Sequence, residues 1–270
     1  MKVEIWSDVV CPWCYVGKRR FEAALSEFPH AAEVEIHWRS FELDPGAPAR
    51  REGPYAERLA TKYGMTVAQA HKSIDHMVDV GRGEGIDFNF EISQAGNTFD
   101  AHRLLHLAGA RGHQHDLKDR LLAATFSEGA PIADRGALKD LAVEAGLDAD
   151  EVEEVLSGDR YAAEVREDEQ RAAVLGITAV PFFVFEGQYG LPGAQSPAVL
   201  LQALQDVWRL SAPLETPEPK QTPEAQQTPE SEEKPGPEER LSAEETPPAA
   251  EEPAPSCEGD SCEGDSCVVA

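Results

Sequence analysis

The most constraining feature of the sequence is a pair of cysteines, Cys11 and Cys14, separated by two residues. The pair follows a short apolar segment, residues 3–6, that predicts a strand. It also opens a segment with helical periodicity that runs from Pro12 to about Phe28. A Cys-x-x-Cys pair between a strand and a helix is typical of a thioredoxin-like redox site. The alternative is half of a zinc site, but the body of the chain has no other cysteine to complete it.

The position of the pair predicts different roles for the two thiols. Pro12 suits the first helical position, which places Cys11 at the helix N-cap. There its sulfur faces unpaired backbone N–H groups and the positive end of the helix dipole, so we expect its pKa to lie below the ~8.5 of a free cysteine. Cys11 is therefore the predicted nucleophile. Cys14, one turn further along, is the predicted resolving thiol.

Charge and proline are concentrated at one end of the chain. The net charge is −26, and half of it falls in residues 211–270, which also hold 11 of the 20 prolines. Such a segment cannot bury enough apolar surface to offset its ordering entropy, so it is predicted to be a disordered tail. Residues 1–210 are enough for one α/β domain that carries an insertion.

The composition also limits the classes of function. A strongly acidic chain without a basic patch disfavours nucleic acid and anionic membranes as partners. No apolar stretch resembles a signal peptide or a membrane span, so we expect a cytoplasmic protein. In a reducing compartment a cysteine pair is more often catalytic or redox-sensing than structural.

The rest of the body alternates between strand and helix patterns. Residues 34–38 predict a second strand, parallel to the first. From about 46 to 158 the pattern is helical with recurrent glycine stops, which predicts an inserted domain of about five helices. A helix over 159–175, an apolar strand that follows Pro181 and a last helix over 197–210 complete the domain.

The segment Cys11-Pro12-Trp13-Cys14-Tyr15-Val16-Gly17 resembles the active-site motif of the FrnE-like branch of the DsbA family. The resemblance continues through residues 41–45, 97–103, 176–185 and 189–195. It implies a thioredoxin fold with an inserted all-helical domain. It also implies thiol–disulfide oxidoreductase or isomerase activity on protein thiols and disulfides, without a bound cofactor or metal. A cis peptide bond between Val180 and Pro181, facing the cysteines, is the third implication.

Five further residues are candidates for roles at this site. The cis Pro181 would present the backbone of Val180 to an extended substrate peptide. Trp13 is expected to lie exposed beside the cysteines as a substrate contact, or else to pack on the insertion. Asp8 could relay protons to the resolving thiol, or could serve as a turn or capping residue. His102 could support the thiolate, or could be an ordinary surface or packed histidine.

The family also contains glutathione-dependent relatives, the 2-hydroxychromene-2-carboxylate isomerases and kappa-class glutathione transferases. These commonly carry serine at the position of Cys11 and lack the second cysteine. Retention of both thiols favours dithiol chemistry here and leaves glutathione as an allowed co-substrate. Strongly oxidising members carry a histidine between their cysteines, and its absence favours a less oxidising pair. The direction of electron flow stays open.

The tail ends in a five-residue repeat that places cysteine at 257, 262 and 267, with Glu, Gly, Asp and Ser between them. Three hypotheses remain for Cys257, Cys262 and Cys267: an auxiliary redox relay with the active-site pair, a soft-metal site, or no function. A redox-sensing or metal-binding protein that acts through these cysteines is the non-enzymatic alternative. The neighbouring carboxylates disfavour thiolates, which weakens the relay hypothesis.

Overall fold

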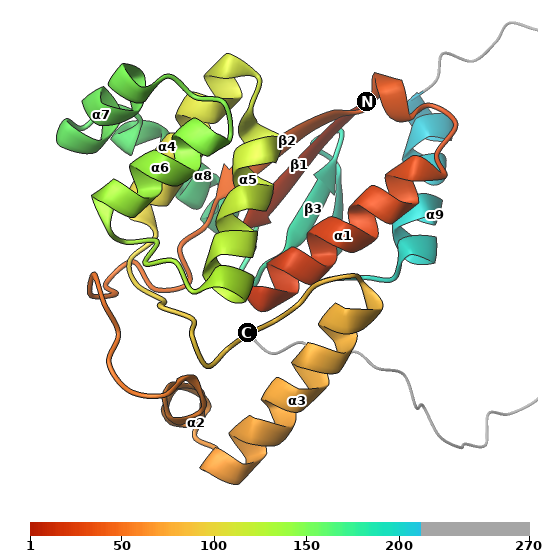
Figure 1. The fold of residues 1–270 in the computed structure, drawn as a ribbon. Helices are drawn as coiled ribbons and strands as arrows, with labels where there is room; N and C mark the ends of the chain where they lie inside the picture. Colours follow the sequence, from red (N-terminus) through yellow and green to blue (C-terminus); the bar gives the residue numbers. More distant parts are fainter. Residues whose placement is uncertain (212–270) are drawn as a thin grey trace, which may run out of the picture. The chain divides into compact units, whose positions relative to one another are not determined.

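The computed structural model describes residues 1–211 and is organised around a four-stranded sheet with the order β2-β1-β3-β4 (Figure 1). The strands are β1 (Lys2–Ser7), β2 (Glu35–Ser40), β3 (Phe182–Phe185) and β4 (Tyr189–Pro192). β1 and β2 are parallel, as the sequence predicts, whereas β3 and β4 add in antiparallel fashion. The predicted disorder of the tail concerns residues that lie outside the described part.

Helices connect and cover this sheet. They are α1 (Pro12–Ser26), α2 (Tyr55–Tyr63), α3 (Val67–Gly83), α4 (Phe99–Arg111), α5 (Gln114–Ala123), α6 (Arg135–Glu144), α7 (Ala149–Ser157), α8 (Ala162–Val174) and α9 (Pro197–Ser211). Six of them lie between β2 and α8, where about five were predicted. Gly112 ends α4 in the left-handed region, and α5 begins two residues later. α8 begins three residues later than predicted, after Tyr161 with a φ of 65°.

Alternation along β1 explains the two layers around the sheet. Val3 and Ile5 point toward α1 and α9 and belong to one hydrophobic core with Phe21 and Leu204. Trp6 points to the opposite face, where it packs with Ala172 of α8. Because both faces are covered, all of β1 after its first residue is buried (Figure 1). This layering is the thioredoxin-like arrangement that the cysteine motif predicts.

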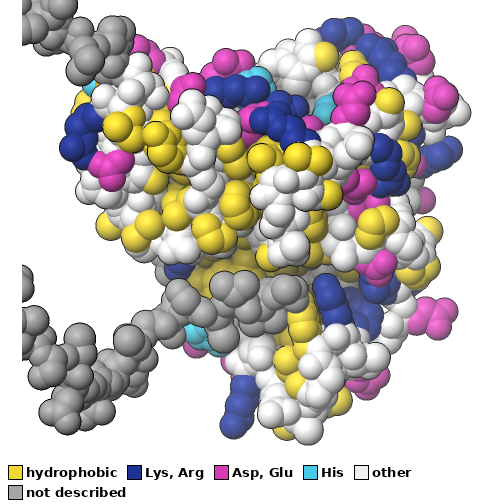
Figure 2. Space-filling view, turned by 180° about the vertical axis from the view of Figure 1, so that it is seen from behind, with side chains coloured by type: hydrophobic (Ala, Val, Ile, Leu, Met, Phe, Trp, Pro, Cys, Tyr) yellow, Lys and Arg dark blue, Asp and Glu magenta, His cyan; other side chains and the backbone are white. Residues whose placement is uncertain are grey.

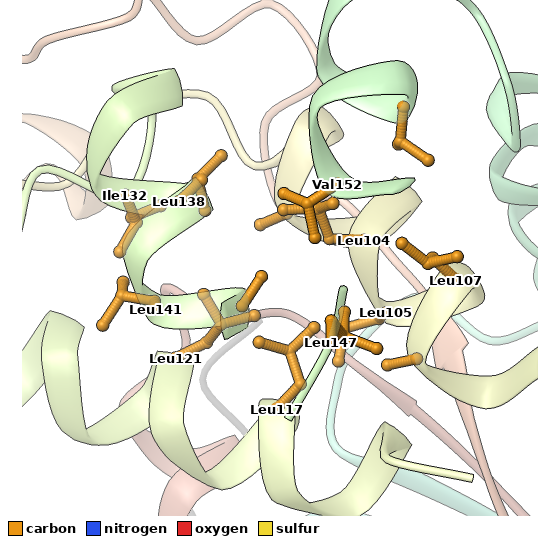
Figure 3. Packing of buried hydrophobic residues seen from close by; sticks show 14 of the residues in the cluster. Leu104, Leu105, Leu107, Leu117, Leu121, Ile132, Leu138, Leu141, Leu147 and Val152 are labelled. Carbon is orange, nitrogen blue, oxygen red and sulfur yellow. The ribbon is translucent and has the colours of Figure 1, made fainter. Parts of the chain in front are cut away.

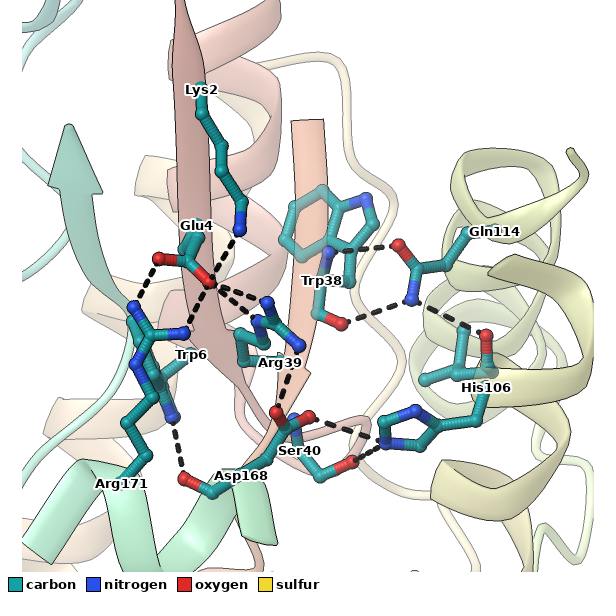
Figure 4. Close-up of polar contacts among 11 residues, drawn as sticks. Lys2, Glu4, Trp6, Trp38, Arg39, Ser40, His106, Gln114, Asp168 and Arg171 are labelled. Atoms are coloured by element: carbon teal, nitrogen blue, oxygen red, sulfur yellow. Dashed lines mark hydrogen bonds and ion pairs between the residues drawn. The ribbon is translucent and has the colours of Figure 1, made fainter. Parts of the chain in front are cut away.

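A buried carboxylate interrupts the apolar pattern of β1 and connects three elements. Glu4 is 1% exposed and receives hydrogen bonds from Arg39 of β2 and Arg171 of α8 (Figure 4). Burial alone would raise the pKa of Glu4, but these two guanidinium groups hold it below its usual value. Arg39 also donates to Asp168, 3.1 Å away. The network fixes α8 against the sheet.

The outer edge of β2 is closed by a side chain rather than by another strand. The Gln114 amide accepts from the Trp38 N–H at 2.9 Å and donates to the Trp38 carbonyl at 3.0 Å (Figure 4). Further along the edge, the Ser40 N–H donates to Asp168 at 2.9 Å. Because these backbone groups are already paired, this edge is not available for strand addition by a peptide.

The inserted helices have their own leucine-rich core, which reaches the active-site loop. Leu104, Leu117, Leu138 and Val152 come from α4, α5, α6 and α7 and are all fully buried (Figure 3). Val9, in the loop that follows β1, is buried in the same cluster. The insertion therefore holds the loop that precedes the cysteines.

Candidate active site

Cys11 and Cys14 occupy the first turn of α1, where the sequence predicts them. Cys11 is the N-cap, with extended backbone angles and with Pro12 directly after it. The Cys14 N–H donates to the Cys11 carbonyl at 3.0 Å. Both are free thiols; Cys11 is 5% exposed and Cys14 is completely buried. Of the two thiols, only Cys11 therefore keeps any solvent exposure.

The loop before β3 brings Val180 and Pro181 to the cysteine pair. The peptide bond between them is cis, as the resemblance implies. The Cys11 thiol donates to the Val180 carbonyl, with 3.6 Å between Sγ and oxygen. On the other side, a Cβ added to Gly17 would lie 2.8 Å from Cγ of Pro181. Only glycine at this position of α1 lets the proline ring approach so closely.

Beneath the cysteines lies a lysine that the sequence analysis missed. Lys118 of α5 is fully buried, and its ammonium donates to the Ser7 carbonyl at 3.4 Å and lies 5.5 Å from the centre of the Trp38 ring. The sequence did contain a signal for a buried lysine, because leucines that are themselves buried flank Lys118 on α5. A lysine on an apolar helix face needs a charged or polar partner in the folded protein.

Asp8 and His102, the candidates for proton relay and for thiolate support, are brought together. The imidazole Nε2 of His102 lies 3.3 Å from Oδ1 of Asp8, and both side chains are buried. Asp8 also accepts hydrogen bonds from the N–H groups of Val9 at 2.7 Å and Leu43 at 2.8 Å. Asp8 therefore holds the loop that follows β1 to the loop that contains Leu43, as a capping residue does. Its carboxylate also adds a negative charge near the thiol pair.

The two thiols of the reduced pair influence each other's pKa. Hydrogen bonding with Cys14 is the largest cause that raises the pKa of Cys11, followed by burial. For Cys14 burial acts to raise the pKa, but the hydrogen bond with Cys11, the Lys118 charge and Ser7 outweigh it and lower it. The two thiols titrate as one hydrogen-bonded pair, so the expected acidity of Cys11 relative to Cys14 stays a prediction. The Lys118 charge that acts on Cys14 is brought there by the packing of α5.

This arrangement predicts that Cys11 titrates differently once its partner is removed. In Cys14→Ser the thiol whose hydrogen bond does most to raise the pKa of Cys11 is gone, and the helix N-terminus remains. We expect the Cys11 pKa to fall relative to the intact reduced pair. The rate of alkylation against pH, measured with the tail cysteines replaced by serine in both chains, reports it. An unchanged or higher midpoint in Cys14→Ser would contradict the coupling.

Trp13 and Tyr55 border the site from the side of the insertion. Trp13 is partly buried and packs against an aromatic cluster that includes Phe88 and Phe90, so the packing alternative describes much of its surface. Its role in binding substrate stays a prediction. Tyr55, at the start of α2, packs on Phe90 with 4.7 Å between ring centres. Burial first, and then negative charge on Cys11, raise the pKa of Tyr55. Tyr55 packs against the same aromatic cluster as Trp13.

Comparison with known proteins identifies the family of the chain. Residues 2–205 match the DSBA-like thioredoxin domain. The chain belongs to the DSBA-like thioredoxin family. Its sequence is 48% identical to that of a probable DsbA oxidoreductase from Streptomyces coelicolor, whose crystal structure is similar with a TM-score of 0.75. The match covers 79% of this chain and 92% of that one.

A further sequence relative and a further solved structure are less similar to this chain. The uncharacterised protein YwbO of Bacillus subtilis is 31% identical over 211 residues, which cover 76% of this chain and 96% of that protein. The cytosolic disulfide reductase DsbM of Pseudomonas aeruginosa shares the fold, with a TM-score of 0.54 and 18% identity, over 78% of this chain and 100% of that one. The family assignment confirms the DsbA resemblance, although no comparison singles out the FrnE-like branch.

The other predicted features are addressed only within the described residues. In residues 1–211, no three His, Cys, Asp or Glu side chains are grouped so that they could hold a metal ion. No helix in this part of the chain is long and apolar enough to cross a membrane. Cys257, Cys262 and Cys267 lie outside the described residues.

Proposed function

We propose that this DsbA-family protein is a thiol–disulfide oxidoreductase that exchanges disulfides with protein substrates through Cys11 and Cys14. The observation that carries the proposal is the asymmetry of the pair. Cys11 is reachable and faces the Val180 carbonyl, whereas Cys14 is completely buried in front of Lys118. One sulfur is thus placed to meet a partner and the other to hold negative charge.

The proposed reaction begins when a substrate thiolate attacks the sulfur of Cys11 in the oxidised enzyme. The bond between Cys11 and Cys14 breaks, and its electron pair passes to Cys14 as a mixed disulfide forms at Cys11. A thiol with a lowered pKa is a better leaving group, and the Lys118 ammonium stabilises the departing thiolate. A second substrate thiolate then displaces Cys11, which leaves an oxidised substrate and a reduced enzyme. The reverse sequence of steps reduces a disulfide.

The backbone around Pro181 supports protein substrates. Val180 is partly exposed and its carbonyl faces the reactive sulfur, so an extended peptide can pair with the backbone of this loop while its cysteine reacts. The two sulfurs carry the electrons, so this reaction requires no bound organic cofactor, and glutathione serves as a small co-substrate. The Pseudomonas protein that shares this fold is a cytosolic disulfide reductase, which supports a cytoplasmic location for this chain.

The test is disulfide exchange with a protein. Oxidised full-length enzyme is incubated with a reduced, unfolded protein, and reduced enzyme with a native disulfide-bonded protein, and thiols are quantified over time. We expect exchange in the native chain and none in Cys11→Ser. Cys14→Ser is expected to accumulate mixed disulfides with the substrate. Reaction with glutathione alone, and with neither protein, would instead favour a glutathione-dependent small-molecule enzyme.

A further inference from the structure

Glu42, in the loop that follows β2, is a buried carboxylate that the proposed reaction does not use. Figure 2 shows basic and acidic side chains intermixed on one face of the molecule, so a surface ion pair is an ordinary feature of this chain. Glu42 pairs with the half-exposed Arg166, but its own side chain has no exposed area. Its Oε2 lies 3.3 Å from Nη1 of Arg166, whereas Oε1 has no hydrogen-bond partner within residues 1–211. A buried oxygen without a partner is costly, so the stability of the fold does not explain this carboxylate.

His102 also has one buried atom without a partner. Its imidazole is 1% exposed, and Nε2 lies 3.3 Å from Oδ1 of Asp8. Nδ1, on the other side of the ring, has no hydrogen-bond partner in the described part of the chain. A neutral imidazole has one N–H and one lone pair, so it can take up a proton at one nitrogen and release a proton from the other. The ring is therefore placed to pass protons between Asp8 and a group that faces Nδ1.

Direct contacts bring Glu42 and His102 to the same carboxylate. The backbone N–H that follows Glu42 donates to Oδ2 of Asp8 at 2.8 Å, and His102 lies against Oδ1. Arg166, which pairs with Glu42, has its guanidinium carbon 4.4 Å from the centre of the Phe99 ring. Phe99 lies one turn before His102 on α4. Asp8, Phe99 and Arg166 thus confine Glu42 to the neighbourhood of the imidazole.

The other end of this series of residues is the thiol pair. Asp8 follows directly on β1, and only two residues separate it from Cys11. Burial raises the pKa of Cys14, but the hydrogen bonds that act against it include one from Cys11 and one from the Asp8 backbone. Cys14 has no exposed area. Each proton that Cys14 gains or loses must therefore cross the interior of the protein.

We propose that Asp8, His102 and Glu42 form a buried proton relay between Cys14 and the surface. This inference rests on the proposed exchange activity and deepens it, because the exchange steps at Cys14 move a proton as well as electrons. One water bound between Nδ1 of His102 and Oε1 of Glu42 would satisfy both unpartnered atoms and complete the relay.

The relay acts when the reduced enzyme has formed a mixed disulfide at Cys11. The proton of Cys14 passes to Asp8 and then to Nε2 of His102. The proton on Nδ1 leaves for the Glu42 carboxylate, which releases it to solvent beside Arg166. The Cys14 thiolate attacks the Cys11 sulfur, and the bond to the substrate breaks with its electron pair on the substrate sulfur. In the opposite direction the same atoms return a proton to Cys14.

The relay predicts a pH dependence that belongs to Glu42. Burial is the main cause that raises the pKa of Glu42, Glu169 adds to the rise, and the charges of Arg166 and His102 act against it. Only the carboxylate form can accept a proton. The Cys14 step should therefore slow as the pH falls through this raised pKa. Lys118, which lies on the other side of Asp8, titrates at a higher pH, with a pKa of about 8.

The experiment uses the full chain with serine in place of the tail cysteines, so that the active-site pair supplies the only thiols. The reduced chain is mixed with bis(2-hydroxyethyl) disulfide, quenched with acid and analysed by mass spectrometry. The first rate reports the mixed disulfide at Cys11, and the second rate reports its loss as Cys14 attacks. If Cys11 does not react, the proposed function and the relay both fail.

The decisive variant is Glu42→Gln, which keeps the volume and removes the acid. We expect the second rate to fall about ten-fold and its decline at low pH to disappear, whereas Glu42→Asp should restore part of both. Glu169→Gln is the matched control, because Glu169 also pairs with Arg166 but is partly exposed. It should keep the native second rate and pH profile. A native second rate and profile in folded Glu42→Gln overturns the relay and leaves the proposed function standing.

The unchanged folded body gives an independent measurement in mixtures of H2O and D2O. Because the relay moves more than one proton, the second rate should fall along a curve as the deuterium fraction rises. The first rate, which reports attack by Cys11 without the relay, is the internal reference. A second rate that falls along a straight line, or no more than the first rate, overturns the relay even where no variant folds.

Discussion

Lys118→Met is expected to raise the pKa of Cys14 and to slow disulfide exchange at neutral pH. The Lys118 charge lowers the pKa of Cys14 against the effect of burial, and methionine removes that charge while it keeps most of the volume. Each pKa unit corresponds to about 1.4 kcal/mol, or ten-fold in the population of the thiolate. We therefore expect reduction of the Cys11–Cys14 disulfide by a small thiol to slow at least several-fold. The measurement is the rate from pH 5 to 9.

The pH dependence separates this role from simple damage. Burial lowers the pKa of Lys118 itself to about 8, so the native rate should change as this lysine loses its proton, and that change should vanish in Lys118→Met. Because a charged lysine is unfavourable in such a site, the variant should not unfold at a lower denaturant concentration. Lys139→Met, on the surface next to Glu153, is the control. A native pH profile in Lys118→Met would contradict the role.

Asp8→Asn is expected to destabilise the fold, and most strongly at neutral pH. Burial works to raise the pKa of Asp8, but hydrogen bonds from His102 and Leu43 outweigh it and lower the pKa below its usual value. A carboxyl group with a lowered pKa stabilises the fold above its unfolded value of about 3.9, and this contribution is lost as pH falls. Asparagine keeps only one of the two acceptor oxygens and has no charge, so one of the buried N–H donors loses its acceptor, which should cost about 1–3 kcal/mol at pH 7.

The measurement is the free energy of unfolding by denaturant at pH 7, 5 and 3. The difference between the native chain and Asp8→Asn should be largest at pH 7 and should shrink toward pH 3. Other carboxylates with a lowered pKa, such as the partly exposed Glu22 with a pKa of about 2, act equally in both chains and cancel. Asp79→Asn, an exposed position of α3, is the control. A difference that stays constant with pH would show that the Asp8 charge contributes nothing.

Local sequence patterns were enough for the elements and for the reactive pair. The N-cap at Cys11 and the start of α1 follow from the cysteine spacing and Pro12, which act within one helical turn. The parallel pairing of β1 and β2 follows from a strand–helix–strand order. The cis bond before Pro181 was implied only by the family resemblance, because a single X-Pro pair gives no local signal for it.

The chemistry around the pair was decided by tertiary structure. Cys14 and Lys118 are about a hundred residues apart in the sequence, and the packing of α5 behind the cysteines brings them together. The same packing brings a positive charge that acts on Cys14, whereas the helix N-terminus acts on Cys11. Likewise, Asp8 and His102 were separate candidates in the sequence and are hydrogen-bonded partners in the fold. Periodicity and capping are local, but electrostatic fields depend on which distant charges the fold buries together.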